Sequence, residues 1–410
     1  MSTQALGWDI HRKFSKVSLM EKTAEGEIRV IERARLEHAD RDAMRRWLSR
    51  LPEQTPVALE AAFGWPWIAD FLEDLKLDPH LGHPPALKVL AQHEAKSDRC
   101  DGDRLGKFQL RGIFPESYLA PPDVRQIRER TRYRMALSGL RSSVKNRVHA
   151  ILHRFGILHS FSDLFGKQGR RFLEQLELPS ASRAVLTSSL EILDEVVRHI
   201  QDVEKWMENN LEEDEIVRLL RTIPGIGLIL AHVIRAEIGQ ISRFPTARHL
   251  RSYAGTAPLS DDSADRHGAR HCSPACNHAL RWALIEAVTG MLLTTGEKSL
   301  RLRRLHTRLT HGGKSNKNQA KVALAGELAE LVFIIWKKRT PYEAMPPARP
   351  GSIQKEPARE PAREPRHEEN QENQENQENQ ENQVSANMRS DQSCHPIARR
   401  GTSGAGQAHL

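Results

Sequence analysis

The chain has 410 residues, of which 61 are Lys or Arg and 53 are Asp or Glu, so its formal net charge is +8 and its pI is near 9.4. With the eight basic and ten acidic residues from Pro346 onward set aside, the first 345 residues carry +10, which favours a polyanionic partner. The sequence shows no signal peptide, no apolar run near the roughly 20 residues of a membrane helix, and no disulfide framework among its cysteines. These features exclude disulfide-rich secreted and membrane-spanning classes and predict a cytoplasmic protein of two or three domains. The cysteines are Cys100, Cys272, Cys276 and Cys394.

The first hundred residues alternate strand-like and helix-like patterns. Short apolar runs, with a turn at Gly26, give way to a helical spacing and then to another strand and helix. This order predicts a mixed α/β sheet of the ribonuclease-H type. The expected strands cover residues 6–10, 16–20, 27–31 and 56–60, and the expected helices cover residues 39–51 and 65–75.

Four acids in this region stand where a solvated surface does not explain them. Asp9 lies inside one apolar run and Glu60 closes another, while Asp98 and Asp101 are three residues apart and share one face of an expected helix. Carboxylates in such surroundings are retained when they are paired, hydrogen-bonded or bound to a cation. Four of them converging from two strands and a helix would make a site for Mg²⁺, or for Mn²⁺, of the kind used in phosphoryl transfer on nucleic acid.

A long amphipathic helix is predicted from Asp123 to Phe155, with proline in its first turn. Nine Lys or Arg residues and only two acids lie in this range. Such a face can be merely solvated, but with so few interleaved acids it indicates contact with phosphates. The residues expected to make that contact are Arg125, Arg128, Arg132, Arg141, Lys145 and Arg147.

A second long helix begins at about Ala181 and has a short coiled-coil pattern. Two interpretations remain open for its apolar seam: a helix hairpin with residues 123–155, or a dimer interface. The residues of the seam are Leu186, Leu190, Leu193, Val197 and Ile200.

The run Ile223-Pro-Gly-Ile-Gly227 precedes an apolar helix over residues 228–238 and is typical of a helix-hairpin-helix motif. In that motif the glycines, here Gly225 and Gly227, allow backbone N–H groups to approach a phosphate. The alternative is a tight turn with no ligand.

Further along, the chain contains Tyr253-Ala-Gly-Thr-Ala-Pro258, then Ser263, then Ala275-Cys-Asn-His-Ala-Leu-Arg-Trp-Ala-Leu284. Together with the acids, these blocks resemble the insertion-sequence family 110 transposases, the guide-RNA-directed or bridge recombinases, over residues 5 to 340. The resemblance implies a RuvC-like first domain whose four acidic positions are Asp9, Glu60, Asp98 and Asp101, and a last domain with Ser263 as nucleophile. It also implies DNA ends and targets as substrates, a structured guide RNA and a homo-oligomer, a dimer or tetramer. Ala264 and Gly102 stand where the family usually has glycine and alanine.

The chemistry that follows is cleavage and rejoining of DNA. Ser263 attacking a scissile phosphate would form a phosphoserine that conserves the bond energy, whereas attack by water would lose it. Two rivals are a RuvC-like endonuclease that uses metal-bound water and a non-catalytic nucleic-acid-binding descendant. A zinc site is disfavoured because the available side chains fit no common finger spacing. Those side chains are His267, His271, Cys272 and Cys276.

The resulting division of the chain has four parts: a RuvC-like α/β domain over residues 1–120, a helical coiled-coil region over 121–215, a mainly α serine transposase domain over 216–345, and a tail over 346–410. The tail contains five Glu-Asn-Gln triplets from Glu369 to Gln383. Its composition cannot bury a core, so we expect it to be disordered and to have no catalytic role.

Overall fold

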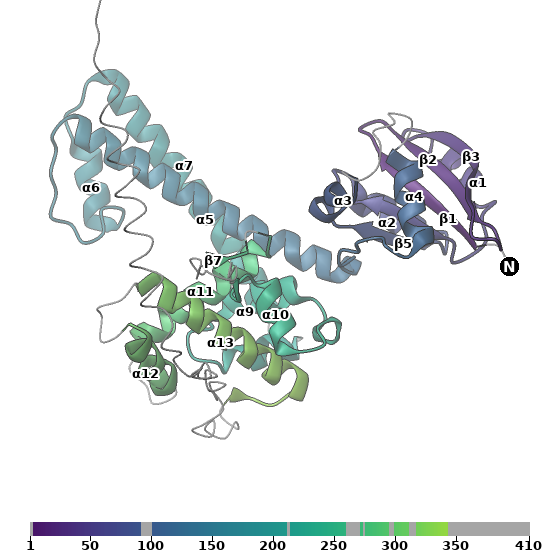
Figure 1. Cartoon of the computed structure of the whole chain (residues 1–410). Helices are drawn as coiled ribbons and strands as arrows, with labels where there is room; N and C mark the ends of the chain where they lie inside the picture. Colours follow the sequence, from purple (N-terminus) through teal and green to yellow (C-terminus); the bar gives the residue numbers. More distant parts are fainter. Residues whose placement is uncertain are drawn as a thin grey trace, which may run out of the picture. The chain divides into compact units, whose positions relative to one another are not determined.

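A computed structural model describes residues 3–91, 101–210, 214–259, 271–273, 275–294, 299–310 and 317–342 (Figure 1). All of them belong to the unit Met1–Met345. Within these ranges, no helix combines the length and the apolar composition needed to cross a bilayer.

The chain begins with a five-stranded sheet in the order β3-β2-β1-β4-β5. β1, β2 and β3 form an antiparallel meander, and β4 and β5 run parallel to β1. The expected mixed α/β sheet is therefore confirmed, with longer strands than predicted and with β5 as an additional strand. The bounds are β1 Thr3–Ile10, β2 Phe14–Lys22, β3 Ile28–Glu37, β4 Pro56–Glu60 and β5 Asp78–Gly82.

Helices cover both faces of this sheet. Leu6, Trp8 and Leu59 point to the face where α1 and α2 supply Met44 and Leu72, and all five side chains are fully buried. The alternate residues of the strands, such as Ala5 and Ala58, point to the other face and pack with side chains of α3 and α4. The period-two alternation of the strands therefore decides which residues meet α4. The helices are α1 Arg41–Leu48, α2 Trp65–Asp74, α3 Pro84–Ala91 and α4 Asp101–Arg111.

Glycines allow α4 to lie directly against β1. A Cβ atom at Gly7 would lie 1.8 Å from the carbonyl oxygen of Gly102, and one at Gly106 would lie 2.8 Å from Sδ of Met20. Backbone therefore touches backbone at Gly7, and no larger residue fits there. This contact brings the first turn of α4, which begins at Asp101, against the strand that carries Asp9.

Two long helices, α5 Pro122–Arg154 and α7 Ser180–Asn209, lie side by side with α6 Lys167–Gln175 against them (Figure 1). Leu137 packs with Val196 and Ile200, while Val148 packs near Leu186, so the two helices run antiparallel. Of the two interpretations left open by the sequence, the structure has the hairpin within one chain. The leucines at 186, 190 and 193 are buried in it and are not free to form a dimer seam.

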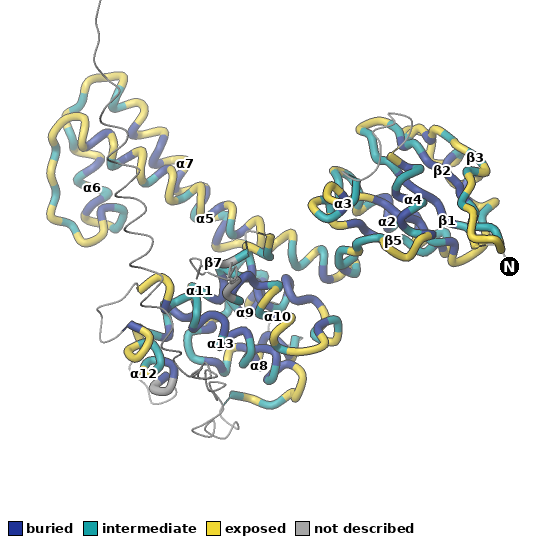
Figure 2. The backbone as a smooth tube through the Cα atoms, in the orientation of Figure 1, coloured by how far each residue is buried: buried dark blue, intermediate teal, exposed yellow. Residues whose placement is uncertain are grey.

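The remaining helices form a second large core. Residues of α8, α9, α11 and α13 are among its fully buried members, and Figure 2 shows these stretches in dark blue. A two-stranded ladder pairs Pro258 with Cys272 and Leu259 with His271. The elements are α8 Glu215–Arg221, α9 Leu228–Ile238, the 3₁₀ turn η1 Ile241–Arg243, α10 Ala247–Tyr253, β6 Pro258–Leu259, β7 His271–Cys272, α11 His278–Leu293, α12 Leu300–Leu309 and α13 Lys317–Lys338.

Candidate functional site

Three of the four predicted acids lie in one corner of the sheet domain. Trp8 pairs with Leu59 across parallel strands, so the next residues, Asp9 and Glu60, end neighbouring strands at the same edge. Asp101 is the first residue of α4, the helix that covers this face. Asp98 lies outside the described residues, so its place on the predicted helix face is not tested.

The three carboxylates act on one another electrostatically. Desolvation raises the pKa of Asp9, and the Asp101 charge raises it further against the opposing effect of His11. Desolvation also raises the pKa of Glu60, with added contributions from Asp101 and Asp9. Desolvation combined with repulsion between neighbouring carboxylates is a pattern often found at functional sites.

Two basic side chains lie beside these acids. His11 Nε2 lies 3.1 Å from Asp9 Oδ2, and Arg104 pairs with Asp101 one turn along α4. Among the described side chains, no three His, Cys, Asp or Glu converge closely enough to hold a metal ion as they stand. The donor chemistry nevertheless suits Mg²⁺, which prefers carboxylate oxygens and keeps several waters.

A fifth acid, Asp103, was not singled out by sequence and has a different role. It accepts hydrogen bonds from Ser18 Oγ at 2.5 Å and from Arg33 Nε and Nη2 at 3.1 and 2.7 Å. Although desolvation opposes it, these bonds lower the pKa of Asp103. Asp103 therefore fixes α4 to β2 and β3, and in doing so fixes Asp101 two residues earlier.

The cations predicted to contact phosphate divide into two groups. Arg125 pairs with Asp70, Arg128 donates to the carbonyl oxygens of Ala236 and Glu237 at 2.8 and 2.9 Å, and Arg132 forms two hydrogen bonds with the Glu237 carboxylate. These three guanidinium groups are engaged within the chain, which corrects the expectation of a cationic face open along the whole helix. The spacing of charges on α5 could not reveal partners that lie about 100 residues away.

The second group lies nearer the end of α5. Arg147 is exposed, Arg141 is half-buried, and the Lys145 ammonium lies 4.6 Å from the centre of the Phe165 ring. Phosphate contact by these three side chains remains a prediction.

The glycines of the predicted hairpin also have separate roles. Gly225 has φ +84°, and a Cβ atom there would lie 2.1 Å from the carbonyl oxygen of Ala287 on α11. Gly225 is therefore required for the packing of the turn, a role that the tight-turn interpretation explains without a ligand. Gly227 precedes α9, and a Cβ atom there would meet nothing within 4 Å, so the beginning of α9 is uncrowded at this residue.

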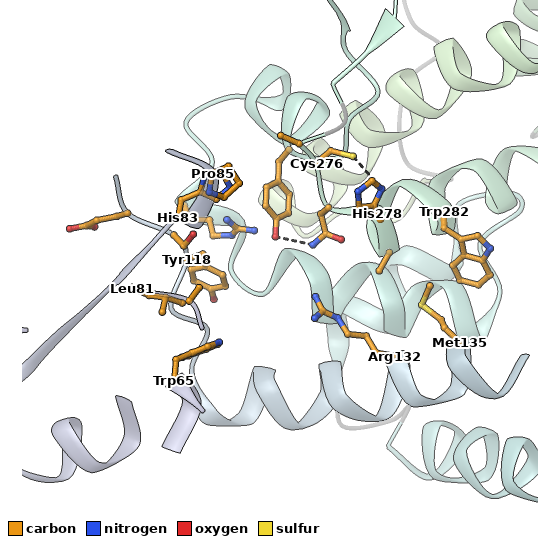
Figure 3. Close-up of a pocket in the computed structure, with 18 residues that line it drawn as sticks. Trp65, Leu81, His83, Pro85, Tyr118, Arg132, Met135, Cys276, His278 and Trp282 are labelled. Carbon is orange, nitrogen blue, oxygen red and sulfur yellow. Dashed lines mark hydrogen bonds between the residues drawn. The ribbon is translucent and has the colours of Figure 1, made fainter. Parts of the chain in front are cut away.

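A buried carboxylate, Glu237, joins α5 to the segment around the serine motif. It is fully buried and receives hydrogen bonds from Arg132 at 2.7 and 2.8 Å and from Asn277 Nδ2 at 2.8 Å. Asn277 Nδ2 also lies 2.9 Å from Tyr253 Oη, a contact drawn in Figure 3. Desolvation alone would raise the pKa of Glu237, but Arg132, Asn277 and Arg128 outweigh it and hold that pKa below its ordinary value.

The Tyr-Ala-Gly block has a physical reason for its glycine. Gly255 has φ +65°, and a Cβ atom there would lie 2.5 Å from Cys276 Sγ. The backbone N–H of Asn277 donates a hydrogen bond to the carbonyl oxygen of Tyr253 at 2.9 Å, so the block that begins at Tyr253 and the block that begins at Ala275 are in direct contact. Ser263 belongs to the connection between β6 and β7 and lies outside the described residues.

Of the four side chains considered for zinc, the structure describes Cys276, so the zinc hypothesis is not tested. Cys276 Sγ lies 3.9 Å from Nδ1 of His278, which was not in the predicted set. His267 and the side chains of His271 and Cys272 are outside the described residues. Both Cys276 and His278 line a cavity of 1110 Å³ together with Arg132, Met135 and Trp282 (Figure 3). Neither Asp9, Glu60 nor Asp101 lines it.

Comparison with known proteins finds a family match for the segment with the acids and another for the segment with the serine. Residues 6–157 match the DEDD model of the IS110 transposases, described as "Transposase", and residues 217–302 match the model described as "Transposase IS116/IS110/IS902 family". The chain belongs to the IS110-type transposases. The first match contains Asp9, Glu60, Asp98 and Asp101, and the second contains the hairpin, the Tyr-Ala-Gly block and Ser263.

Named relatives agree with this assignment. The chain is 24% identical over 290 residues to the "Transposase for insertion sequence element IS1328" of Yersinia enterocolitica, which covers 70% of this chain and 85% of the relative. It is 27% identical over 212 residues to the "Transposase for insertion sequence element IS1111A" of Coxiella burnetii, covering 48% and 57%. It is also 27% identical over 180 residues to the "Insertion element IS116 uncharacterized 44.8 kDa protein" of Streptomyces clavuligerus, covering 42% and 43%.

In this transposase we expect Glu237→Gln to lower the free energy of unfolding by about 2 kcal/mol at neutral pH, because the buried carboxylate loses its charge-assisted hydrogen bonds with Arg132, whose own side chain is 56% exposed. The direction in which this stabilisation changes with pH follows from the lowered pKa of Glu237. The stabilisation is present above the unfolded pKa of about 4.3 and is lost as pH falls through the lower folded value. Denaturant unfolding of the parent and the variant between pH 3 and 7 measures the difference in their free energies of unfolding. This difference should become smaller as the pH falls.

The control is Glu195→Gln, which removes an exposed carboxylate paired with Arg198 on α7 and should change stability little. If the free energies of unfolding of the parent and Glu237→Gln differ as much at pH 3 as at pH 7, then Glu237 is not stabilised as an ionised carboxylate.

Proposed function

We propose that the chain is the DNA transposase or recombinase of an insertion sequence, which cleaves and rejoins DNA through a phosphoserine on Ser263 with the help of a Mg²⁺-binding carboxylate site. The observation that supports the proposal is that Asp9 and Glu60 end neighbouring strands at one edge of the sheet, where the charge of Asp101 raises the pKa of both, in a sheet whose strand order and directions suit a ribonuclease-H-type domain. The match of residues 217–302, which contain Ser263, to the second family model supports the part of the proposal that concerns the serine.

In this proposal the metal ligands are Asp9, Glu60, Asp98 and Asp101. Bound Mg²⁺, or Mn²⁺, would supply positive charge to the oxygens of a scissile phosphate. The chain's own part is to hold the acids in place. Gly7 lets α4 approach, Asp103 anchors that helix, His11 lies beside Asp9, and Arg104 pairs with Asp101.

The serine step exchanges one phosphodiester for another. Ser263 Oγ forms a bond to phosphorus and loses its proton, while the bond from phosphorus to a deoxyribose oxygen breaks and that oxygen gains a proton. A hydroxyl of a second strand then attacks the phosphoserine and releases Ser263. The number of P–O ester bonds is unchanged, so the rejoining needs no ATP.

The partners in this proposal are the DNA of the element ends and target, a structured guide RNA and further copies of the chain. DNA is supported by the family and by the +10 charge of the first 345 residues. The guide RNA and the homo-oligomer are supported by the family resemblance alone. The division into domains over 1–120, 121–215 and 216–345 with a tail over 346–410 is part of the same proposal.

The second candidate is a metal-dependent endonuclease that uses water. It is favoured by the fact that the carboxylate corner is built within the sheet domain from β1, β4 and α4 alone. The deciding experiment is a denaturing gel of the protein with cleaved DNA. A protein–DNA adduct at Ser263 supports the recombinase, and free DNA ends without an adduct support the endonuclease.

The exposed end of α5 gives a separate prediction for DNA binding. Changing Arg141, Lys145 and Arg147 together to Ala should weaken binding and lower the slope of log K against log salt by about 0.9 for each lost phosphate contact. Binding isotherms for one duplex between 50 and 200 mM salt measure the slope. Arg198→Ala, which removes an exposed cation of α7 paired with Glu195, is the matched control and should leave it unchanged. An unchanged slope in the triple variant would mean that this face is only solvated.

A further inference from the structure

The turn that follows Glu60 presents a large aromatic side chain to solvent. Phe63 is 94% exposed, more than Leu158 at 86% or Leu293 at 81%. A phenylalanine with almost its whole surface in water loses the free energy that burial would give. A single exposed apolar residue is common on protein surfaces, so Phe63 is distinguished by its fixed position and by what lies near it.

The position of Phe63 is fixed by the backbone on both sides. The N–H of Ala62 donates to the carbonyl of Glu60 at 2.7 Å, and the N–H of Trp65 donates to the carbonyl of Ala62 at 3.3 Å. Gly64 then turns the chain with φ +90° directly into α2. Phe63 therefore stands at the tip of a short hydrogen-bonded turn.

The other two aromatic residues of this turn are held from outside. The Arg41 guanidinium lies 3.4 Å from the centre of the Trp67 ring, and His38 meets that ring edge-on at 4.9 Å. Arg125 lies 5.6 Å from the Trp65 ring. Of the three aromatic side chains in the turn and the start of α2, Phe63 is the one directed to solvent, and its neighbours brace the backbone beneath it.

The distance to the carboxylates suits a nucleic-acid strand. Phe63 is three residues after Glu60, which limits the separation of their Cα atoms to roughly 10 Å. A span of that size can be covered by one short stretch of a strand, because each nucleotide advances the strand by at least roughly 3.4 Å. A strand whose phosphate lies at Asp9, Glu60 and Asp101 therefore brings a nearby base within reach of the Phe63 ring.

We propose that Phe63 is a base-stacking residue, which binds the face of an unpaired base on the strand whose phosphate lies at the carboxylate corner. The proposal rests on the function proposed above, because it needs a nucleic-acid strand at those acids. Stacking on an aromatic ring is tolerant of sequence, since every base has a π-face. Phe63 would thus hold the strand in register beside the acids without reading its sequence.

The test uses the full chain in chelator, so that binding is measured without cleavage. Affinities are determined for a single-stranded thymine oligonucleotide and for an abasic strand of the same length, and the ratio of the two isolates the contribution of the bases. We expect Phe63→Ala to lower this ratio by about tenfold. Phe63→Trp should keep the ratio at or above the parent value, because indole also stacks.

Leu158→Ala is the control, since it removes a similarly exposed apolar side chain from the segment after α5 and should leave the ratio unchanged. Because Phe63 is exposed, its truncation should not unfold the protein, and circular dichroism of the variant checks this. Equal ratios for the parent and Phe63→Ala would overturn the stacking role. So would a change of oligomeric state with an unchanged ratio, which would make Phe63 a protein contact. The proposed catalytic function is tested separately, by metal-dependent cleavage.

Discussion

Asp101→Asn should abolish metal-dependent strand cleavage, with a loss of at least about a thousandfold. A metal ion at a reacting phosphate supplies several kcal/mol of transition-state stabilisation, and each 1.36 kcal/mol is tenfold in rate. Asparagine keeps the shape of aspartate but lacks the charge that would hold the ion. The change should leave the fold intact, because the Asp101 side chain is 62% exposed and its pair with Arg104 contributes little to stability.

Asp103→Asn is the matched control, two residues along the same helix. It removes the same charge from a side chain that is hydrogen-bonded to Ser18 and Arg33 and only positions Asp101, so it should lower the melting temperature and reduce cleavage far less than Asp101→Asn does. Single-turnover cleavage of a labelled strand in Mg²⁺, in Mn²⁺ and in chelator measures all three proteins. Parent-like cleavage by Asp101→Asn at matched Mg²⁺, or parent cleavage in excess chelator, would refute the carboxylate site.

The strand positions of Asp9 and Glu60 could be predicted from the sequence because strand geometry is local. Each acid stands in or at the end of an apolar run, and the alternation of strand side chains explains why both lie on the face that α4 covers. The helix of residues 65–75 was recognised for the same reason, since its apolar spacing is internal to the segment. β5 was missed because Asp78-Pro-His-Leu-Gly82 has no alternation of its own, and its place depends on pairing with β4.

Long-range partners could not be predicted in the same way. The cationic pattern of α5 is correct as a pattern, yet Arg128 and Arg132 are held by Glu237, which is more than 100 residues away. A buried carboxylate inside an apolar helix was the available signal, because Glu237 stands in Ala236-Glu-Ile238 and needs a cation. Asp103 was missed because two more prominent acids precede it and its partners lie on β2 and β3.

Ser263→Ala should remove both the covalent protein–DNA adduct and the recombinant product. If Ser263 Oγ is the nucleophile, a reaction stalled on nicked or mismatched DNA leaves one DNA end joined to this residue, and no other group on the side chain of alanine can replace it. A nuclease that uses metal-bound water predicts the opposite result: cleavage with free ends, no adduct, and little effect of the alanine beyond binding.

Two further variants make the serine test specific. Ser260→Ala lies three residues earlier in the same connection between β6 and β7, so it controls for loss of a hydroxyl and should keep both adduct and product. Ser263→Cys should give a trapped or slow intermediate, because a thiolate is intrinsically more nucleophilic but sulfur changes the bond length and the leaving-group chemistry. Adducts quantified on a denaturing gel for the parent and the three variants decide the mechanism. Cleavage by Ser263→Ala at the parent rate would refute the serine route and leave the carboxylate corner with water as its nucleophile.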